Sequence, residues 1–594
     1  MNYIKHLDGL RGVSIIFVVL YHIKPNLFSG GYVGVDVFFV ISGYLITSKI
    51  VSENKFEIKN FYINRFKRLY PTTLTVLIIT TIFTFIFFTP SHLKDYSQSV
   101  ISTIFFTSNL LFFTENSYFH SDSLLKPLIH TWSLGIEEQF YLFFPILIII
   151  FKKKWKLILI YITLISLTIS IFTVDLYAKA NYFLPFFRFW EITVGCLIYI
   201  YKDLIYEKLK RLNQVGILGL FFLIISLFLY NSSTAFPGYN ALLIVVSSVL
   251  LILNNDPSSI LNKTLSNNFL VHIGKLSFTI YLVHQPVFSI YKYLNGTELS
   301  ILNSSLLLFL IYFISLIINE FIEKKYRRKK YNIKSKTTIA LFTIILIVFS
   351  MIGHYSNGYE HRLNNFNLKS TNYSGDRGVV GPGKITNFND SVVLYGDSFA
   401  QQLLPELSSK YGVFYSIQPG CISLNNLVIS SNKIVTNECK NQSQFFNNPS
   451  IDSYENIVIS FSWNNIKSLK QYENVLKEIN LLSNKLNSKN IVLIGPSPNS
   501  NFDGGYIKCL LNYFSECSNK YLLENSKNFI WNDYLSKEKL NTNVNLFNLF
   551  EIFCDEKFCY ETIEDNLIYY DGSHTTEFSS KLIVDNLLYL FNED

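Results

Sequence analysis

The sequence predicts a multi-pass α-helical membrane domain followed by a soluble α/β domain. Long apolar runs fill residues 12–354 of the 594-residue chain, and hydrophobic residues make up 49% of the whole. Beyond residue 354 these runs stop, and Asn, Ser, Asp and Lys become frequent. Runs of about 20 apolar residues are typical of transmembrane helices, so the first part indicates a membrane domain and the second a soluble one.

We expect eleven membrane crossings: ten in the main domain and one that links it to the soluble domain. The candidate spans are residues 12–24, 31–50, 72–90, 139–152, 155–175, 183–201, 215–231, 239–254, 271–293, 301–321 and 336–354. The apolar run 98–113 is shorter, and counting it as a crossing would move a basic loop outside, so we expect it to be re-entrant or interfacial. No small-residue cleavage site follows the first run, which favours a retained span over a signal peptide.

Basic segments between the apolar runs predict the orientation. Lys and Arg gather on the cytoplasmic side of membrane proteins, so we place four segments inside: 55–68, 152–156, 202–211 and 323–336. The N-terminus then lies inside and the soluble domain outside. The formal net charge of +8 is densest in these segments, so it does not indicate a nucleic-acid partner.

The cysteines give independent support for an outside location. Six of the seven lie in the soluble part, and an even set in a small domain suggests disulfides and an oxidising compartment. Six cysteines allow fifteen pairings, of which the simplest joins sequence neighbours. Those pairs are Cys421 with Cys439, Cys509 with Cys517, and Cys554 with Cys559.

Two short motifs at opposite ends of the soluble domain indicate nucleophilic catalysis. "SVVLYGDSFAQQLLPEL" reads as a buried strand, a tight turn with Ser398, and a helix; "YYDGSHTTEF" places Asp571 three residues before His574. Each alone fits an ordinary turn or helix cap. Together they predict a serine nucleophile, a histidine base and an orienting carboxylate. Further strands are expected at "GVFYSI", "NIVISF" and "NIVLIGP", which fits a parallel sheet.

With these motifs the domain resembles the SGNH (GDSL-like) hydrolases. The resemblance implies a flavodoxin-like α/β sandwich with Ser398 as nucleophile, His574 as general base and Asp571 as its partner. The family's Gly-x-Asn-Asp block is absent; "WNN" follows the strand "NIVISFS" instead, similar to the Trp in SGNH domains fused to membrane acyltransferases. The family's oxyanion-hole glycine would fall at Gly420 in "IQPGCIS".

Ionisable residues recur in or beside the predicted spans. A charged group inside a bilayer is costly and implies a polar cavity. Structural roles also fit: the basic pair can set topology, the acidic pair can start a helix, and Arg188 with Glu191 can form a buried ion pair. The candidate site residues in this part are Arg11, His22, Asp36, Arg65, Arg68, Glu137, Glu138 and His284.

The motifs around these residues resemble the acyltransferase 3 family of membrane O-acyltransferases. They are "LDGLRGVSIIFVVLYH", "GGYVGVDVFFVISGYLI", "RFKRLYP", "HTWSLGIEEQFYLFFP" and "LSFTIYLVHQP", in that order. The family's Arg-x10-His motif falls on Arg11 and His22, and its Arg-x-x-Arg motif on Arg65 and Arg68. The resemblance implies a membrane domain at 1–325, a linking span at 326–354, an extracytoplasmic linker at 355–388 and an SGNH domain at 389–594.

The resemblance further implies acetyl transfer from cytoplasmic acetyl-CoA to an extracytoplasmic glycan, without a metal. Arg11 and His22 lie about 16 Å apart along a continuous helix, a span that the pantetheine arm of CoA can match. We therefore expect Arg11, with Arg65 and Arg68, to hold CoA phosphates, and His22 to meet the thioester as general base or transient acyl acceptor. Ser398 would then carry the acyl group to the glycan.

The expected location is the inner membrane of a Gram-negative cell, with the N-terminus cytoplasmic and the SGNH domain periplasmic. The expected acceptor is lipid-linked or lipopolysaccharide O-antigen, or a related surface polysaccharide. Two alternatives remain. A transporter or flippase with an appended domain would need no acyl-CoA, and a membrane-anchored glycan esterase would remove acetyl groups from glycan.

Overall fold

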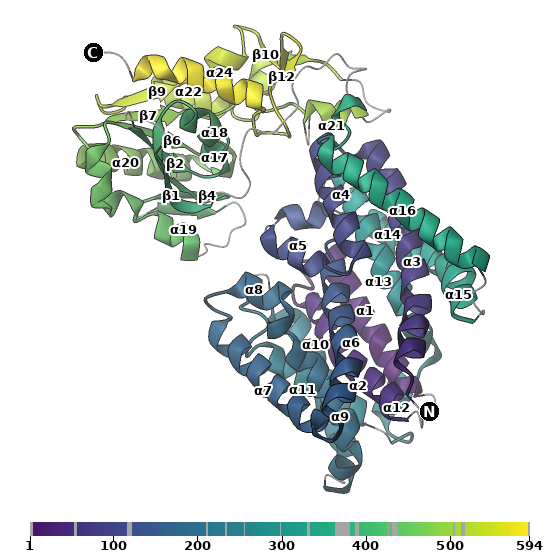
Figure 1. Cartoon of the computed structure of the whole chain (residues 1–594). Coiled ribbons are helices and arrows are strands. Elements are labelled where there is room, and N and C mark those ends of the chain that lie inside the picture. The colour runs from purple at the N-terminus through teal and green to yellow at the C-terminus, as the bar shows by residue number, and fades with distance from the viewer. Residues whose placement is uncertain are drawn as a thin grey trace. The chain divides into compact units, whose positions relative to one another are not determined.

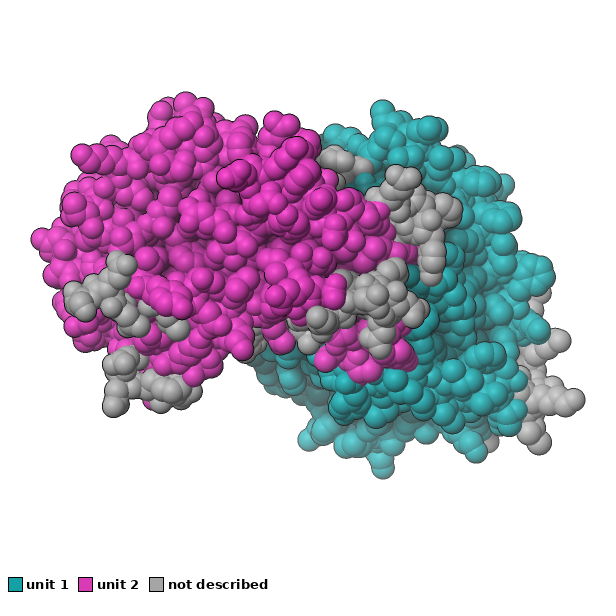
Figure 2. Space-filling view, turned by 90° about the horizontal axis from the view of Figure 1, so that it is seen from above, with its two compact units in different colours: residues 1–86, 93–355 teal, residues 87–92, 356–594 magenta. Residues whose placement is uncertain are grey.

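The structure is a computed structural model in which the chain forms two compact units, coloured separately in Figure 2. The helical unit comprises residues 1–86 and 93–355, and the α/β unit comprises residues 87–92 and 356–594. The structure describes residues 4–52, 56–115, 121–208, 212–231, 234–254, 256–296, 299–328, 333–362, 380–386, 391–425, 427–430, 437–502, 505–511 and 517–591.

The helical unit is built from long apolar helices (Figure 1). Its helices are α1 (Lys5–Ile23), α2 (Gly34–Ser52), α3 (Ile58–Phe87), α4 (Pro90–Ile104), α5 (Ser108–Thr114), α6 (Thr131–Phe151), α7 (Trp155–Thr173), α8 (Ala178–Phe183), α9 (Phe189–Lys208), α10 (Leu212–Leu229), α11 (Ala241–Leu253), α12 (Ile260–Leu265), α13 (Asn268–Asn295), α14 (Ile301–Ile318), α15 (Lys324–Arg328) and α16 (Ile333–Tyr355). Among the described residues, six helical stretches are long and apolar enough to cross a membrane, one of them containing both α6 and α7. The number of crossings stays a prediction.

Several helices do not coincide with the predicted spans, because hydropathy marks the apolar part of a helix and not its end. Helix α3 begins at Ile58, so Arg65 and Arg68 lie inside a helix rather than in a loop. Helix α6 begins at Thr131, which places Glu137 and Glu138 in its second turn instead of at its exposed start. The predicted span 183–201 is broken around Pro185, and Arg188 precedes α9. The apolar run 98–113 falls on α4 and α5, which are separate helices.

Helices α1 and α13 approach each other through glycines. A Cβ atom at Gly12 would lie 2.3 Å from the carbonyl oxygen of Leu270, and one at Gly274 would lie 1.7 Å from that of Asp8. Both distances are shorter than any van der Waals contact, so only glycine fits at either place. Small residues allow such backbone-to-backbone packing of membrane helices.

The α/β unit contains a six-stranded mixed sheet in the order β1-β3-β2-β6-β7-β9. Strand β1 is antiparallel to β3 and lies within the segment predicted as a linker; the other neighbours are parallel. A flavodoxin-like fold stays a prediction, and residues 363–379 of that linker lie outside the described residues. The strands are β1 (Gly381–Ile385), β2 (Ser391–Gly396), β3 (Gly412–Ile417), β6 (Asn456–Ser460), β7 (Asn490–Ile494) and β9 (Val544–Phe547).

Alternating side chains bury both faces of this sheet. Val393 and Tyr395 of β2 point into a core with α20 (Leu469–Lys485) and α22 (Phe529–Lys537). Val392 and Leu394 point into the opposite core, with α18 (Leu404–Ser408) and α24 (Glu577–Leu587). The period of two in a strand thus gives a sheet covered on both sides, with its loops at the strand ends left to form a site (Figure 1).

Three smaller features complete the unit. Disulfides join Cys421 to Cys439, Cys509 to Cys517, and Cys554 to Cys559, which are the sequence-neighbour pairs. Two-stranded ribbons pair β4 (Cys421–Leu424) with β5 (Leu427–Ser430), β8 (Lys520–Leu522) with β10 (Phe558–Tyr560), and β11 (Thr562–Ile563) with β12 (Asn566–Leu567).

The single helix predicted after Ser398 is divided into α17 (Ser398–Gln401) and α18. The remaining helices are α19 (Asn437–Gln442), α21 (Tyr506–Leu511) and α23 (Phe550–Phe553).

Candidate active sites

Ser398, His574 and Asp571 form a continuous hydrogen-bonded series in the α/β unit. The Nε2 atom of His574 lies 2.8 Å from Oγ of Ser398, and its Nδ1 atom lies 2.8 Å from Oδ2 of Asp571. A carboxylate only accepts, so Nδ1 carries the proton and Nε2 accepts from the Ser398 hydroxyl. In this arrangement the imidazole can take the serine proton as Oγ attacks an acyl carbon.

The loop that carries His574 holds the Asp571 carboxylate in its charged form. Its Oδ1 accepts the backbone N–H groups of Ser573 at 2.7 Å and His574 at 2.8 Å. Burial would raise the pKa of Asp571, but the imidazole of His574 and these N–H groups outweigh it and hold the pKa below its usual range. The backbone N–H of Thr575 also donates to the side chain of Gln402, at 2.9 Å, which ties the loop to the turn after α17.

Ser398 sits at the carboxyl end of β2, between parallel neighbours β3 and β6. Ligands of such sheets bind at the carboxyl ends of the strands. The preceding Asp397 is buried, and its carboxylate accepts the backbone N–H groups of Phe399 and Ser462, each at 2.9 Å. Burial raises the pKa of Asp397 to about 6, against the effect of these N–H groups. Asp397 therefore joins the turn after β2 to the turn after β6.

Gly420 follows β3 on the same edge of the sheet and has a φ angle of 78°, which favours glycine. Its role in an oxyanion hole stays a prediction. After β6, the amide oxygen of Asn464 accepts from Nδ2 of Asn499 at 3.0 Å. The "WNN" turn is thereby connected to the loop that follows β7.

The loop after β7 contacts the loop that carries Asp571 and His574, called the catalytic loop below. The buried carboxylate of Glu561 accepts hydrogen bonds from the loop after β7. The backbone N–H of Ser500 donates to the carbonyl of Gly572 at 3.1 Å. Glu561 is fully buried and accepts from the Ser500 hydroxyl at 3.0 Å and from the Asn501 N–H at 2.8 Å. Burial raises the pKa of Glu561 to about 7, despite these hydrogen bonds.

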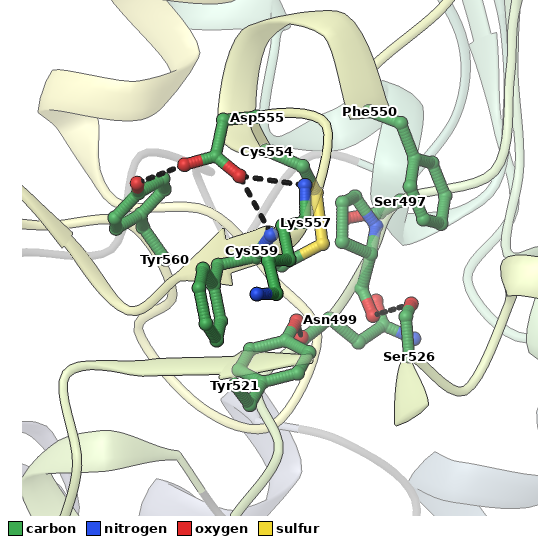
Figure 3. Close-up of a disulfide and its surroundings, with 12 residues drawn as sticks. Ser497, Asn499, Tyr521, Ser526, Phe550, Cys554, Asp555, Lys557, Cys559 and Tyr560 are labelled. Carbon is green, nitrogen blue, oxygen red and sulfur yellow. Dashed lines mark hydrogen bonds between the residues drawn. A yellow bond between two sulfur atoms is a disulfide. The ribbon is translucent and has the colours of Figure 1, made fainter. Parts of the chain in front are cut away.

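The Cys554–Cys559 disulfide anchors the other side of this loop (Figure 3). Cys559 lies opposite Tyr521 in the β8–β10 ribbon, and the Tyr521 hydroxyl donates to the carbonyl of Asn499. The Ser526 hydroxyl donates to the carbonyl of Pro498 at 2.7 Å. The disulfide, the ribbon and the loop therefore form one connected support behind the catalytic loop.

The helical unit contains a cavity of about 170 Å³ whose lining is largely apolar but includes several charged side chains. The basic side chains in its lining are Arg11, Lys49, Arg65 and Arg68; Glu137 is the acid. Pockets for drug-sized ligands are larger, about 300–1,000 Å³, so this cavity suits an arm of a ligand rather than a whole one. The excess of positive charge suits an anionic group.

Arg65 and Arg68 have different surroundings although they share a face of α3. Arg65 donates to Glu138 at 2.5 and 2.8 Å and to Glu137 at 3.2 Å, and its guanidinium lies 3.8 Å from the ring centroid of Tyr141. Nε of Arg68 is buried and has no hydrogen-bond partner among the described residues. Arg11 pairs with Asp8 at 3.3 Å. The acid pair is thus engaged by Arg65, whereas Arg68 keeps donor capacity.

Asp36 does not join the cavity but belongs to a separate buried ion cluster. Nη1 of Arg188 donates to Asp36 at 2.6 Å and to Glu191 at 2.9 Å, and all three side chains are at most 2% exposed. The guanidinium also lies 5.3 Å from the ring centroid of Trp132. This packing supports the structural interpretation of Asp36, in which the cluster holds α2 and α9 together.

His22 and His284 come together at the far end of α1, and His130 joins them. The ring centroids of His22 and His284 are 5.1 Å apart, and those of His130 and His284 are 5.3 Å apart. The three histidines are at most 3% exposed. Nζ of Lys292 donates to the carbonyl of His22 at 2.7 Å. Helix α1 is unbroken from Lys5 to Ile23, so Arg11 and His22 keep the helical spacing expected from the sequence.

Sequence reasoning did not select His130, Tyr281 or Glu561 as site residues. His130 and Tyr281 lie in motifs that were quoted for the resemblance, but only packing shows that the Tyr281 hydroxyl donates to the carbonyl of His130, at 2.7 Å. For Glu561 the short segment "CYETIEDNL" carries no motif. The one local indication that Glu561 is buried is its position two residues after Cys559 in a partly apolar segment.

Comparisons with known proteins match both halves of the chain. The model of the acyltransferase domain family matches residues 4–320, and that of the SGNH domain fused to such domains matches residues 367–588. The O-acetyltransferase OatA of Staphylococcus aureus, from strains NCTC 8325 / PS 47 and COL, is 34% identical over 314 residues, which is 48% of this chain and 51% of the relative. The chain thus spans about half the length of these curated relatives.

A solved structure, the periplasmic domain of a Salmonella ser. Paratyphi A lipopolysaccharide acetyltransferase, is similar over 35% of this chain and 85% of its own, at 16% identity and a TM-score of 0.30. Because this TM-score is low, we draw no conclusion from the similarity. The acyltransferase model covers more than half of the 594 residues, and the SGNH model follows it in the same chain. The chain belongs to the family of membrane acyltransferases that carry a fused SGNH domain.

Proposed function

We propose that the chain is an integral membrane O-acetyltransferase that moves an acetyl group from cytoplasmic acetyl-CoA to a hydroxyl of an extracytoplasmic glycan. The observation that carries the proposal is the Ser398–His574–Asp571 series, hydrogen-bonded in the geometry of acyl transfer. The family supports the reaction class, and the relatives bear the name O-acetyltransferase. The proposed acceptor is lipopolysaccharide O-antigen or a related surface polysaccharide.

The cavity of the helical unit supports a donor site for acetyl-CoA. Arg11, Arg65 and Arg68 supply positive charge for its phosphates. Glu137 and Glu138 fix the pose of Arg65, and Arg68 has an unused donor. His22, about 16 Å along α1 from Arg11, meets the thioester as acyl acceptor or general base.

In the α/β unit the acetyl group is proposed to pass through Ser398. We propose that a small acyl carrier takes the acetyl group from His22 to Ser398. Nε2 of His574 takes the Ser398 hydroxyl proton as Oγ bonds to the acetyl carbon, and the carrier leaves with that proton. A glycan hydroxyl then gives its proton to Nε2 and attacks the acetyl-serine, and the proton returns to Oγ of Ser398. Asp571 stabilises the imidazolium that forms in each half.

The proposed location is the inner membrane of a bacterium, with the N-terminus cytoplasmic and the α/β unit periplasmic. The three disulfides favour an oxidising compartment for that unit. The basic segments between the apolar helices favour a cytoplasmic side for their loops.

The test uses the purified full chain in lipid nanodiscs with radiolabelled acetyl-CoA and smooth lipopolysaccharide. We expect wild type to label the glycan, Ser398→Ala to lose that label, and His22→Ala to lose label on both glycan and protein. Full labelling by Ser398→Ala would remove the series from the pathway, and full labelling by His22→Ala would remove His22.

The same preparation separates the alternatives. A transporter or flippase would move glycan without acetyl-CoA and without dependence on Ser398. An esterase would release label from glycan that had been acetylated beforehand, and it would leave acetyl-CoA unchanged.

A further inference from the structure

His284 has one ring nitrogen whose protonation is determined by its neighbours. Its Nδ1 atom lies 2.7 Å from the carbonyl oxygen of Tyr281 and 3.2 Å from that of Ile280. Carbonyl oxygens only accept hydrogen bonds, so Nδ1 carries the proton. Because a neutral imidazole has one N–H, Nε2 of His284 carries a lone pair.

That lone pair is buried without a partner. Nε2 of His284 has no hydrogen-bond partner among the described residues, and the side chain is 0% exposed. An unsatisfied buried acceptor costs free energy, so its presence in a packed core calls for an explanation such as a catalytic role. The carbonyl contacts, by contrast, explain only the Nδ1 side of the ring.

The neighbours of His284 connect it to both the proposed acyl acceptor and the donor cavity. The His22 ring is tilted by 59° against it, with the centroids 5.1 Å apart, so the two rings are direct neighbours. Tyr281, one turn earlier on α13, lines the cavity, and its hydroxyl lies 2.6 Å from that of Ser133, which also lines it. The ring centroid of Tyr281 also lies 5.4 Å from that of His284, so this tyrosine connects the lining of the cavity to the histidine.

We propose that Nε2 of His284 is the base that accepts the proton of the His22 ring during acetyl transfer. A ring nitrogen of His22 bonds to the thioester carbon, the C–S bond breaks, and CoA leaves as the thiolate. The N–H proton of the acylated His22 passes to Nε2 of His284, which neutralises the acyl-imidazole. When the acetyl group moves on, His284 returns that proton to His22, and the proton of the accepting hydroxyl ends on the thiolate.

This inference rests on the proposed function, because it assigns a partner to His22 in the same reaction. General bases of this kind contribute about 10²–10⁴-fold to rate. The chain offers a matched set of substitutions. In His284→Asn the amide N–H replaces the Nδ1 donor and the Nε2 acceptor is lost, whereas in His284→Gln the amide replaces the Nε2 side instead. His272→Asn, at an exposed position on the same helix, is the control.

The experiment measures single-turnover transfer of label from acetyl-CoA onto the full chain in nanodiscs, with acetyl-CoA affinity measured in parallel. We expect His284→Asn to slow transfer at least about 10²-fold with unchanged affinity, added imidazole to restore part of the rate, and His272→Asn to match wild type. Near-wild-type transfer by His284→Asn beside an inactive His22→Ala would overturn this inference alone. Transfer by His22→Ala would overturn the proposed membrane step and this inference with it.

A second measurement reads the protonation of the histidine ring in the wild-type chain and uses a variant only to assign the signal. In wild-type chain labelled with ¹⁵N-histidine, we expect one buried histidine with a protonated Nδ1 and an unprotonated Nε2, whose signal disappears in His284→Gln and shifts when acetyl-CoA is added. A protonated Nε2 at this residue in the resting chain would overturn the inference, since it could not then act as the acceptor.

Discussion

The two units satisfy their buried acids in different ways. In the helical unit the partners are side chains: Arg188 bonds to Asp36 and Glu191, and Arg65 bonds to Glu138. Buried Glu323 accepts from the hydroxyl of Thr279 and the amide of Asn319. In the α/β unit they are backbone N–H groups and hydroxyls, as at Asp397 and Glu561.

The difference follows from what each architecture leaves available. A helix uses its backbone N–H groups internally except in its first turn, so a carboxylate between helices needs donors from side chains, as Asp36, Glu191 and Glu323 have. The loops after parallel strands have spare N–H groups that must find an acceptor. Removing an arginine therefore leaves a buried carboxylate without its counter-charge in the helical unit. In the α/β unit, removing one hydroxyl donor mainly changes the pKa of the buried carboxyl group.

Asp571 is the exception that sharpens the contrast, because it has both N–H donors and an imidazole. Asp571→Asn keeps an acceptor for the loop and removes the charge opposite His574. We expect hydrolysis of p-nitrophenyl acetate by the full chain to fall about 10³–10⁴-fold, because the imidazolium loses its stabilising partner. Asp452→Asn, at an exposed position, should match wild type. A loss below tenfold would show that the charge of Asp571 is dispensable.

The buried cluster of the helical unit tests the other side of the comparison. Arg188→Met leaves two carboxylates without a cation and should destabilise the unit by about 3–5 kcal/mol. Lys324→Met, which breaks an exposed pair with Glu320, should cost less than about 1 kcal/mol. Thermal unfolding of the full chain in detergent measures both. Equal effects of the two substitutions would refute the distinction drawn here.

Glu561 predicts a pH dependence of stability in the α/β unit. Its pKa is raised to about 7, above the ordinary value of about 4.3 that holds in the unfolded chain. Below both pKa values the proton is bound in the folded and in the unfolded state. The contribution of this group to the free energy of unfolding is then at its maximum. As pH rises from about 4.3 to 7 the unfolded chain releases this proton while the folded unit retains it, which lowers the free energy of unfolding by up to about 4 kcal/mol.

Glu561→Gln removes this titration and should flatten the decline between about pH 4 and 7, measured by unfolding of the full chain across a pH series. Asp397, whose pKa of about 6 acts in the same direction, leaves a smaller slope. Glu473→Gln on the exposed face of α20 is the control and should follow wild type. A curve for Glu561→Gln that overlies wild type would contradict the assignment.

The smallest effects concern the disulfides, which constrain the unfolded chain. Cys421 and Cys439 are 18 residues apart, and Cys554 and Cys559 are 5 apart. Replacing both cysteines by serine should therefore cost about 3 kcal/mol for the first pair and about 2 kcal/mol for the second. Thermal unfolding under non-reducing conditions gives the order. A larger loss at the short loop would mean that its support of Tyr521 outweighs loop entropy.

Much of the architecture could be predicted because its signals are local. A β-branched run and a tight turn predict the strand before Ser398, and a three-residue spacing places Asp571 beside His574. Apolar runs predict the helices of the first unit. The ends of these helices were less predictable. Helix α3 continues through Arg65 and Arg68, where the hydropathy is low but the chain is still helical.

Contacts between distant segments could not be predicted in the same way. The pairing of Arg65 with Glu138 joins α3 to α6, and the approach of His22 to His284 joins the first helix to α13. Residue types show that such charges need partners, but several acids and histidines were equivalent candidates. Packing of whole helices decides among them.

The glycine contact between α1 and α13 has a consequence for how this enzyme family can change. A methyl group at Gly12 would meet the carbonyl of Leu270, so α1 would have to shift along its neighbour. Arg11 and His22 would shift together because they share α1, while His284 would stay on α13. Under the proposed function, a single substitution at this glycine contact would change the position of His22 relative to His284 while the spacing between Arg11 and His22 stays the same. The receipt of the acetyl group and the length of the bound donor could then change independently of each other.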